Sequence, residues 1–368
     1  MQGISTSLKR LLLASIACVL GSAALTYIVD PLQLFRPSRL GTAFYSDDTR
    51  VQNAGLIRSQ SFDTAFMGTS LAIHFRQSDI DRVLGVRSLK LAMTGSNSRQ
   101  QGFVLEQAID RGARRVIWAM DDFIFVDAAD IEADPYLSVD LYRGTAKGIA
   151  SYLFNAAMAK ESVFALLRSV PPLRTPLTRA APYLPLKFAL PDVDDIYALP
   201  RDFDVTSGYN AKRTRAAFAY ITAPARSRFL GEGYGYDVMV RHFERDAVGL
   251  IARYPDVIFD IYFPPYSILQ FVAMRDASPE TLKIVTDLTA RIAQDLTQLP
   301  NVRLHDFRAI KHVTHDLGNY SDVIHHSPVI DAKVLAWLAN GEYRVDPKAP
   351  LMSLDELKAQ VEAYRVER

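Results

Sequence analysis

Residues 64–70 read Thr-Ala-Phe-Met-Gly-Thr-Ser, and this short stretch indicates the fold class. Its apolar part, residues 64–67, is typical of a buried strand, and Gly68 then allows a tight turn. In an open parallel sheet, ligands bind at the carboxyl ends of the strands, so Ser70 stands where a nucleophile is useful. Taken alone, however, Gly-Thr-Ser is more often only a strand-to-helix turn with a capping hydroxyl.

Along the rest of the chain, short apolar runs alternate with longer amphipathic stretches. Four further apolar runs predict buried strands at residues 88–93, 116–120, 258–263 and 302–304. Helical periodicity predicts helices at residues 98–111, 236–253, 279–297, 328–340 and 353–366. A Gly-Ser-Asn-Ser turn before residue 98 is suited to cap the first of these helices. Strands that alternate with helices predict an α/β domain with a parallel sheet.

Residues 127–230 interrupt this alternation. They contain a helical stretch at 145–169 and then six prolines between residues 171 and 191, which disfavour a continuous helix or a central strand. We interpret the segment as an insertion after the third strand, either a cap or partner-docking element or a structural excursion without function. Gly231–Gly235 resembles a phosphate loop only superficially, and we interpret it as a flexible hinge.

The N-terminal segment predicts a membrane anchor. Residues 11–29 read LLLASIACVLGSAALTYIV and carry no charge. As a helix they span roughly the ~30 Å hydrocarbon core of a bilayer. The preceding Lys9-Arg10 pair predicts that this end is cytoplasmic. We therefore expect a single-pass protein of the cytoplasmic (inner) membrane with its main domain in the periplasm or outside the cell.

Two other interpretations of the segment remain. One is a signal peptide cleaved near Ser22-Ala23-Ala24, and the other is a lipoprotein signal that ends at Cys18. With the anchor, the expected organisation is an anchor at residues 1–30, a polar linker or surface wrap at 31–60, and one domain at 61–368 that contains the insertion.

The composition argues against several classes of partner and cofactor. Lys plus Arg number 42 and Asp plus Glu number 41, so no basic excess points to a nucleic-acid partner. Cys18 is the single cysteine, which excludes an intrachain disulfide and a thiolate metal cluster. Five histidines lie close together in the sequence, at positions 305, 312, 315, 325 and 326. Of these, His312 and His315 could supply two zinc ligands, but the sequence has no His-Glu-x-x-His motif. We therefore expect neither a metal nor another cofactor.

A serine nucleophile needs a base, and the base needs an orienting group. Residues 322–325 read Asp-Val-Ile-His. At this spacing, the Asp322 carboxylate can hold Nδ1 of His325 and leave Nε2 free to face a hydroxyl. His326 is the alternative base, and otherwise a substrate-facing or solvated residue; the Asp-x-x-His spacing favours His325.

Together these motifs resemble the SGNH (GDSL-like) hydrolase superfamily, in which a Gly-x-Ser after the first strand supplies the nucleophile and a late Asp-x-x-His supplies the orienter and the base. The resemblance is closest to its membrane-anchored branch, which includes alginate O-acetylation and teichoic-acid D-alanylation proteins. It covers roughly residues 60–126 and 256–340, and it also rests on the aromatic-rich 118–125, Phe263-Pro264-Pro265 and Asn319-Tyr320-x-Asp322.

The resemblance implies a three-layer α/β/α flavodoxin-like fold and a Ser70–His325–Asp322 triad. It also implies a serine-dependent esterase or O-acyltransferase that acts on an extracytoplasmic polysaccharide or cell-envelope polymer, with a membrane-bound acyltransferase as a possible partner.

The oxyanion site departs from the family pattern. Backbone or side-chain donors of Ser70, Gly95 and Asn97 are the candidates, because Asp121-Asp122 stands where the family has Gly-x-Asn after the third strand. A carboxylate repels a developing oxyanion. Asp121, His326 and Arg76 are candidate accessory residues, Arg76 together with His74 for an acidic substrate group. The departure also leaves open a non-catalytic scaffold that binds a polysaccharide or an acyltransferase through residues 127–230.

Overall fold

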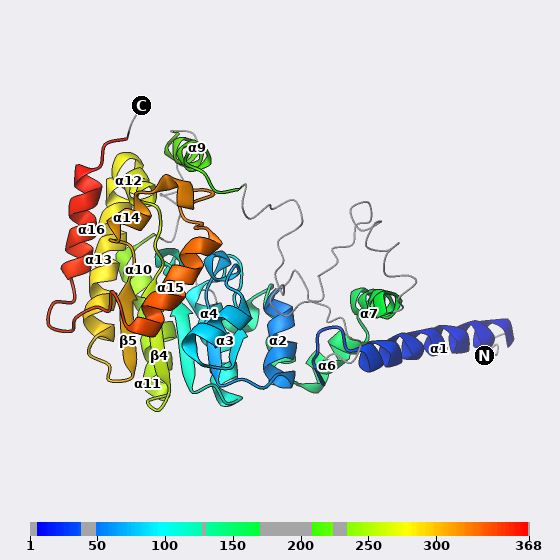
Figure 1. The fold of residues 1–368 in the computed structure, drawn as a ribbon. Helices are drawn as coiled ribbons and strands as arrows, with labels where there is room; N and C mark the ends of the chain where they lie inside the picture. The colour runs from blue at the N-terminus through cyan, green and yellow to red at the C-terminus, as the bar shows by residue number, and fades with distance from the viewer. Residues whose placement is uncertain (1–5, 38–48, 127–129, 170–207, 224–233, 367–368) are drawn as a thin grey trace. The chain divides into compact units, whose positions relative to one another are not determined.

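The computed structural model describes residues 6–37, 49–126, 130–169, 208–223 and 234–366 (Figure 1). The chain divides into two compact units. We call Met1–Gln60 with Asp134–Ala198 the anchor unit, and Ser61–Ala133 with Leu199–Arg368 the sheet unit. This division differs from the expected one, because much of the presumed insertion belongs with the N-terminal segment and not with the sheet.

The sheet unit is built on five parallel strands in the order β2-β1-β3-β4-β5. Their bounds are β1 Thr64–Met67, β2 Ser88–Lys90, β3 Arg115–Ala119, β4 Ile258–Phe263 and β5 Val302–Asp306. All five lie where apolar runs predict them, although β2 ends earlier and β5 later than expected. The α/β class with a parallel sheet is therefore confirmed.

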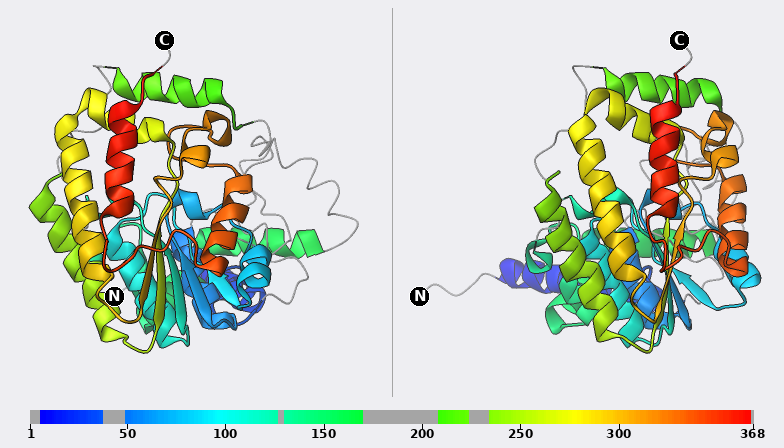
Figure 2. Two further views of the ribbon diagram at one scale, coloured as in Figure 1. Left: turned by 60° about the vertical axis from the view of Figure 1, so that its left-hand side comes forward. Right: turned by 90° about the vertical axis from the view of Figure 1, so that its left-hand side faces the viewer.

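Helices cover both faces of this sheet (Figure 2). On one face, Phe66, Ile117 and Tyr262 share a buried cluster with residues of α3 (Gln77–Leu84) and α15 (Pro328–Asn340). Toward α4 (Ser98–Asp110), the buried Trp118 indole N–H donates to Gln101 Oε1 at 2.6 Å. Strands buried on both faces require near-continuous apolar sequence, which is why these runs show no clear polar alternation.

Among the remaining helices of the sheet unit, those within residues 236–253, 279–297 and 353–366 were predicted from helical periodicity, whereas those at 211–222, 268–277 and 311–314 were not. These helices are α9 Ala211–Thr222, α10 Tyr236–Phe243, α11 Gly249–Arg253, α12 Ile268–Ala277, α13 Pro279–Leu296, α14 Lys311–Thr314 and α16 Met352–Ala363. A π-helical turn at Glu244–Val248 joins α10 to α11, so the expected helix at 236–253 is one rod with a π-bulge. Short 3₁₀ turns lie at Ser70–Ala72, Asp122–Phe125, Ile131–Ala133 and Leu317–Asn319.

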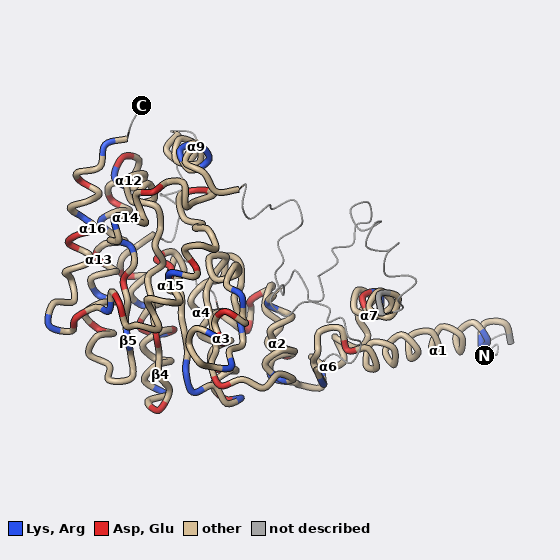
Figure 3. The backbone as a smooth tube through the Cα atoms, in the orientation of Figure 1, with Lys and Arg blue, Asp and Glu red and all other residues tan. Residues whose placement is uncertain are grey.

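The anchor unit contains α1 Thr6–Val29, α2 Thr49–Ser59, α5 Val139–Arg143, α6 Ala146–Leu153 and α7 Ala156–Ser169. α1 is long and apolar enough to cross a membrane, and Figure 3 shows charged residues only near its N-terminal end.

Two expectations for this unit need correction. The polar stretch 31–60, expected to be a linker or surface wrap, contains the largely buried helix α2. The helical stretch 145–169 is two helices, because Asn155 Oδ1 accepts the backbone N–H of Ala157 at 2.8 Å and begins α7. The proline-rich part of the insertion lies outside the described residues, as does most of Gly231–Gly235.

Candidate active site

The turn after β1 places Ser70 at the carboxyl edge of the sheet. A Cβ at position 68 would lie 2.6 Å from the Cβ of Ala72 and 2.8 Å from that of Ala119, so only glycine fits this close approach. The 3₁₀ turn then begins at Ser70. β1 is also the strand at which the order reverses, with β2 on one side and β3 on the other, and ligands of open α/β sheets bind at such points.

Ser70, His325 and Asp322 form a continuous hydrogen-bonded relay. Ser70 Oγ lies 2.8 Å from Nε2 of His325, although 255 positions separate them. Nδ1 of the same ring lies 2.6 Å from Oδ2 of Asp322. The other oxygen of Asp322 accepts the backbone N–H groups of Ile324 and His325, each at 2.8 Å, and these bonds fix the orientation of the carboxylate. This is the arrangement that the Asp-x-x-His spacing predicts.

The electrostatics of the relay favour an imidazole that can gain a proton. Burial lowers the pKa of His325, but the hydrogen bond and charge of Asp322, and then the charge of Asp121, outweigh it, so the pKa lies above its usual 6.5. Burial likewise raises the pKa of Asp322, but hydrogen bonds from His325 and the loop outweigh it and the pKa falls below 3.8. Asp322 is therefore ionised at neutral pH and stabilises an imidazolium.

Several buried groups hold the loop that carries Asp322 and His325. The Tyr320 hydroxyl, which is fully buried, donates to the carbonyl of Pro265 at 2.8 Å. From α9, the Thr214 hydroxyl lies 2.9 Å from the carbonyl oxygen of Leu317 and 3.0 Å from that of Tyr320. Sequence reasoning missed Thr214, because it assigned α9 to an insertion apart from the site and no local motif marks it.

Two candidate oxyanion donors, Ser70 and Gly95, follow the neighbouring strands β1 and β2. Gly95 occupies an exposed turn after β2, the strand next to β1, with φ of +61°, a conformation that favours glycine. Within the described part of the chain, the backbone N–H groups of Ser70 and Gly95 donate to no backbone carbonyl. Asn97 caps α4, because its Oδ1 accepts the N–H of Gln100 at 2.9 Å as half of a capping box. Its use of the side-chain N–H as an oxyanion donor stays a prediction.

Asp121 is a buried carboxylate that is bonded to the residue before the nucleophile. Its carboxylate is fully buried and accepts the hydroxyls of Thr69 and Tyr266, each at 2.5 Å. Burial raises the pKa of Asp121 to about 6, against the lowering effect of the Thr69 and Tyr266 hydrogen bonds. Both oxygens of Asp121 therefore accept a hydroxyl, and the carboxylate tethers Thr69, the neighbour of Ser70.

The prediction for His326, a solvated or substrate-facing residue, is wrong. His326 is 2 % exposed, so it is neither solvated nor facing a substrate. Its Nδ1 lies 3.0 Å from Oδ1 of Asp331 on α15, and its ring makes an edge contact with Phe75. Consecutive histidines therefore have separate surroundings: His325 turns toward Ser70 and His326 packs into the core.

His74 and Arg76 follow the nucleophile on the turn before α3. Burial, and then the proximity of His326, His325 and Lys90, lower the pKa of His74 to about 4, so this ring is neutral at pH 7 and offers no positive charge to an acidic substrate. The Arg76 side chain is exposed at the start of α3. Lys90, buried on β2, donates to the carbonyls of Ile73 and Phe75 at 2.8 and 2.7 Å and holds this turn.

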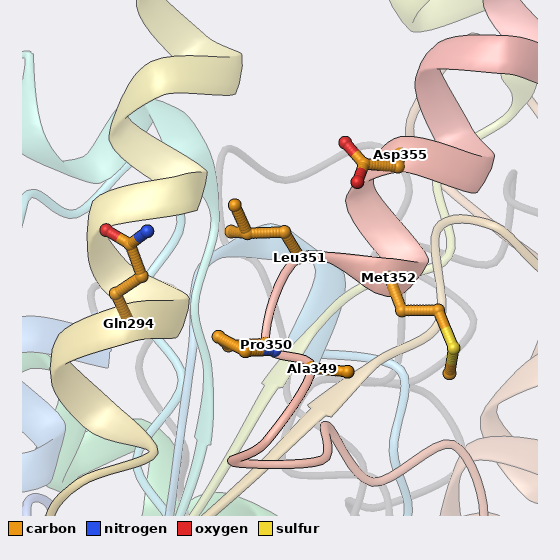
Figure 4. A pocket seen from close by; sticks show the side chains of 6 residues that line it. All are labelled: Gln294, Ala349, Pro350, Leu351, Met352 and Asp355. Carbon is orange, nitrogen blue, oxygen red and sulfur yellow. The ribbon is translucent and has the colours of Figure 1, made fainter.

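Other histidines and pockets lie apart from the relay. Over the described residues, no three His, Cys, Asp or Glu side chains converge to hold a metal ion. His315, for example, pairs with Gln360 at 3.0 Å. A surface depression between α13 and the start of α16 is lined by six residues, of which only Asp355 is charged (Figure 4). None of these six belongs to the relay.

In comparisons with protein-family models, curated proteins and solved structures, no match was found.

Proposed function

We propose that this chain is a membrane-anchored serine esterase or O-acyltransferase of the SGNH type, with Ser70 as nucleophile, His325 as base and Asp322 as orienter. The observation that carries the proposal is the relay from Ser70 Oγ through both ring nitrogens of His325 to Asp322. The strand order β2-β1-β3-β4-β5 supports it, because flavodoxin-like sheets have this order and bind ligands at the same switch point.

In the first half-reaction, Ser70 Oγ attacks an acyl carbonyl carbon while Nε2 of His325 takes the hydroxyl proton. The backbone N–H groups of Ser70 and Gly95 stabilise the resulting oxyanion. Collapse of the tetrahedral intermediate breaks the ester bond, and the imidazolium returns its proton to the departing alcohol oxygen. The acyl group then remains on Ser70.

The second half-reaction decides between hydrolysis and transfer. His325 removes a proton from water or from a sugar hydroxyl, whose oxygen attacks the acyl-enzyme and releases Ser70. With Lys9-Arg10 in the cytoplasm and α1 as anchor, the site faces the extracytoplasmic side, where an acylated polysaccharide or cell-envelope polymer is the fitting substrate class.

Covalent labelling tests the proposal most directly. We expect a fluorophosphonate probe to label the detergent-solubilised full-length protein, and to label neither Ser70→Ala nor His325→Ala. The physical reason is that the probe reacts only with a hydroxyl whose proton an adjacent base can accept. In-gel fluorescence against time measures the reaction.

His312→Ala is the matched control, since His312 is exposed and no described residue of the relay contacts it. Equal labelling of wild type and Ser70→Ala would contradict the assignment of the nucleophile. A folded wild type that stays unlabelled would favour a scaffold that only binds polymer or partner.

The pH dependence of labelling follows from the raised pKa of His325. Only the neutral imidazole accepts the serine proton, so the labelling rate is low in acid and rises to a plateau as the pH passes the pKa of His325. Because Asp322 raises that pKa, we expect a midpoint above 6.5. Initial labelling rates between mildly acidic and mildly alkaline pH measure it, and a midpoint below 6.5 would show that Asp322 does not stabilise the imidazolium.

A further inference from the structure

The anchor unit is tied together where α1 ends. Asp30, 2 % exposed, accepts the backbone N–H groups of the next turn, those of Leu34, Phe35 and Arg36, at 2.9, 2.8 and 3.0 Å. It also accepts the hydroxyl of Tyr152 on α6 at 2.9 Å. The chain therefore reverses directly after the apolar helix, and the reversal is bonded to the segment that leads into α7.

Aromatic and basic side chains surround this reversal. The Phe35 ring lies 5.0 Å from that of Tyr27, which is 48 % exposed, and the Arg36 guanidinium lies 4.6 Å over the Tyr27 ring. Arg36 also donates to the Tyr27 carbonyl. Tyrosine and arginine at the end of an apolar helix are typical of the head-group level of a bilayer. The level of Tyr27 and Arg36 thus marks where α1 leaves the membrane.

α7 packs against α1 on the membrane side of this level. The buried residues of α1 before Asp30 are Ala23, Thr26 and Val29, at its C-terminal end, where α6 and α7 contact it. On α7 the buried residues are small, Ser162 and Ala165, which allows close helix approach. At 1.5 Å per residue, Ala23 lies about 10 Å below Asp30 along α1. Because α7 contacts residues 23–29 of α1, α7 lies beside the C-terminal end of the apolar helix.

The direction and the outer side of α7 fit a position in the plane of the membrane. Figure 1 shows α7 end-on beside the C-terminal end of α1, and Figure 2 shows it lengthwise, so the two axes cross steeply. Val163 of α7 and Phe154 just before it are 43 % and 55 % exposed. Residues 162–167 (SVFALL) carry no charge. If α1 stands along the membrane normal, α7 lies parallel to the surface with Val163 outward, and the exposed Lys160, one turn earlier on the same side, is long enough to keep its ammonium group among the lipid head groups.

We propose that α7 is an interfacial helix embedded in the extracytoplasmic leaflet, with lipid acyl chains covering the side that bears Val163. The inference rests on α1 being the membrane anchor of the proposed function. Lipid is the occupant because α7 contacts α1, the predicted membrane span, which itself exposes apolar residues such as Ile28, 69 % exposed. The depth also agrees with the roughly 5–10 Å at which amphipathic interfacial helices lie.

Site-specific fluorescence in vesicles tests this proposal. Cys18 is the only cysteine, so Cys18→Ser gives a thiol-free full-length background. In it, Val163→Cys, Ile28→Cys and Ile258→Cys are each labelled with an environment-sensitive nitrobenzoxadiazole dye. The proteins are reconstituted into phosphatidylcholine–phosphatidylglycerol vesicles that contain lipids with a nitroxide near the head group or near the chain end. Ile258, at the start of β4 and 41 % exposed, is the matched control for Val163.

We expect the dye at position 163 to lose more of its emission with the shallow nitroxide than with the deep one, because interfacial helices lie only roughly 5–10 Å below the surface. The dye at 258 should be unaffected. Quenching at 28 without quenching at 163 would overturn the α7 proposal and keep the anchor. Absence of quenching at both would overturn the anchor itself. Blue-shifted but unquenched emission at 163 would mean that protein, and not lipid, covers α7.

Discussion

Replacing Asp322 by asparagine is expected to lower the rate of ester turnover by roughly 10⁴-fold, as removal of the orienting carboxylate does in other triads. An asparagine keeps an oxygen for the backbone N–H groups of Ile324 and His325, so the loop stays folded. Its amide group, however, donates toward Nδ1 of His325. The ring must then carry its proton on Nε2, which points at Ser70 Oγ and cannot accept the serine proton.

Release of nitrophenol from a nitrophenyl acetate ester by the full-length protein measures this effect. Asp316→Asn is the matched control, because Asp316 is an exposed carboxylate on the same segment whose Oδ1 accepts only the local N–H of Gly318 at 3.1 Å. We expect Asp316→Asn to keep wild-type turnover. If Asp322→Asn also keeps it, Asp322 does not orient the base and the relay is not catalytic.

Local patterns were sufficient to predict the sheet and the residues of the relay. Strands such as β3 were predicted from short apolar runs bounded by turn signals, here residues 116–120, and the number and spacing of these runs indicate the α/β class. The Asp-x-x-His spacing works because a carboxylate three residues before a histidine in one loop reaches its Nδ1, as it does here at 2.6 Å. Both signals depend on neighbours in the sequence.

Features that depend on distant partners were not predictable in this way. The grouping of residues 134–198 with the N-terminal segment rests on contacts such as that between Asp30 and Tyr152, which are 122 positions apart. From the sequence, the carboxylate of Asp121 was expected only to repel a developing oxyanion. Its bonds to Thr69 and Tyr266 could not be predicted, because these partners lie 52 and 145 positions away. His326 could not be assigned to the core without Asp331 and Phe75, which the chain brings to it only on folding.

Replacing Arg308 by methionine is expected to reduce the free energy of unfolding by about 3–5 kcal/mol, as breaking one partner of a buried ion pair does elsewhere. Arg308 is 1 % exposed and lies just after β5. It donates to both oxygens of Asp306, each at 2.9 Å, and to Asp122 at 3.2 Å. Methionine fills much of the volume of the arginine side chain but leaves the buried carboxylates of Asp306 and Asp122 without their shared cation.

Urea unfolding followed by circular dichroism measures the loss. Arg291→Met is the control, because its pairs with Asp295 and Glu244 are partly exposed, and we expect a loss of at most about 1 kcal/mol. An Arg308→Met loss as small as that of the control would mean that water or rearrangement compensates the buried carboxylates.

The pH dependence of the Arg308→Met deficit gives a second test of the same cluster. Burial raises the pKa of Asp122 to about 6 even though Arg308 lowers it, so without Arg308 the pKa should rise further. In Asp306, burial raises the pKa but the charge and hydrogen bonds of Arg308 outweigh it, so removing Arg308 raises that pKa too. Groups with raised folded-state pKa values bind protons more readily when folded, and they destabilise the fold as the pH rises.

The deficit of Arg308→Met relative to wild type should therefore shrink as the pH falls from 7 toward 5, while that of Arg291→Met stays constant. Asp122 directly follows Asp121, whose carboxylate tethers Thr69 next to the nucleophile. If the cluster also sets the position of Ser70, folded Arg308→Met should react more slowly with the fluorophosphonate probe than Arg291→Met at equal folded fraction. Equal labelling rates of the two variants would mean that Arg308 stabilises the fold but does not affect the position of Ser70.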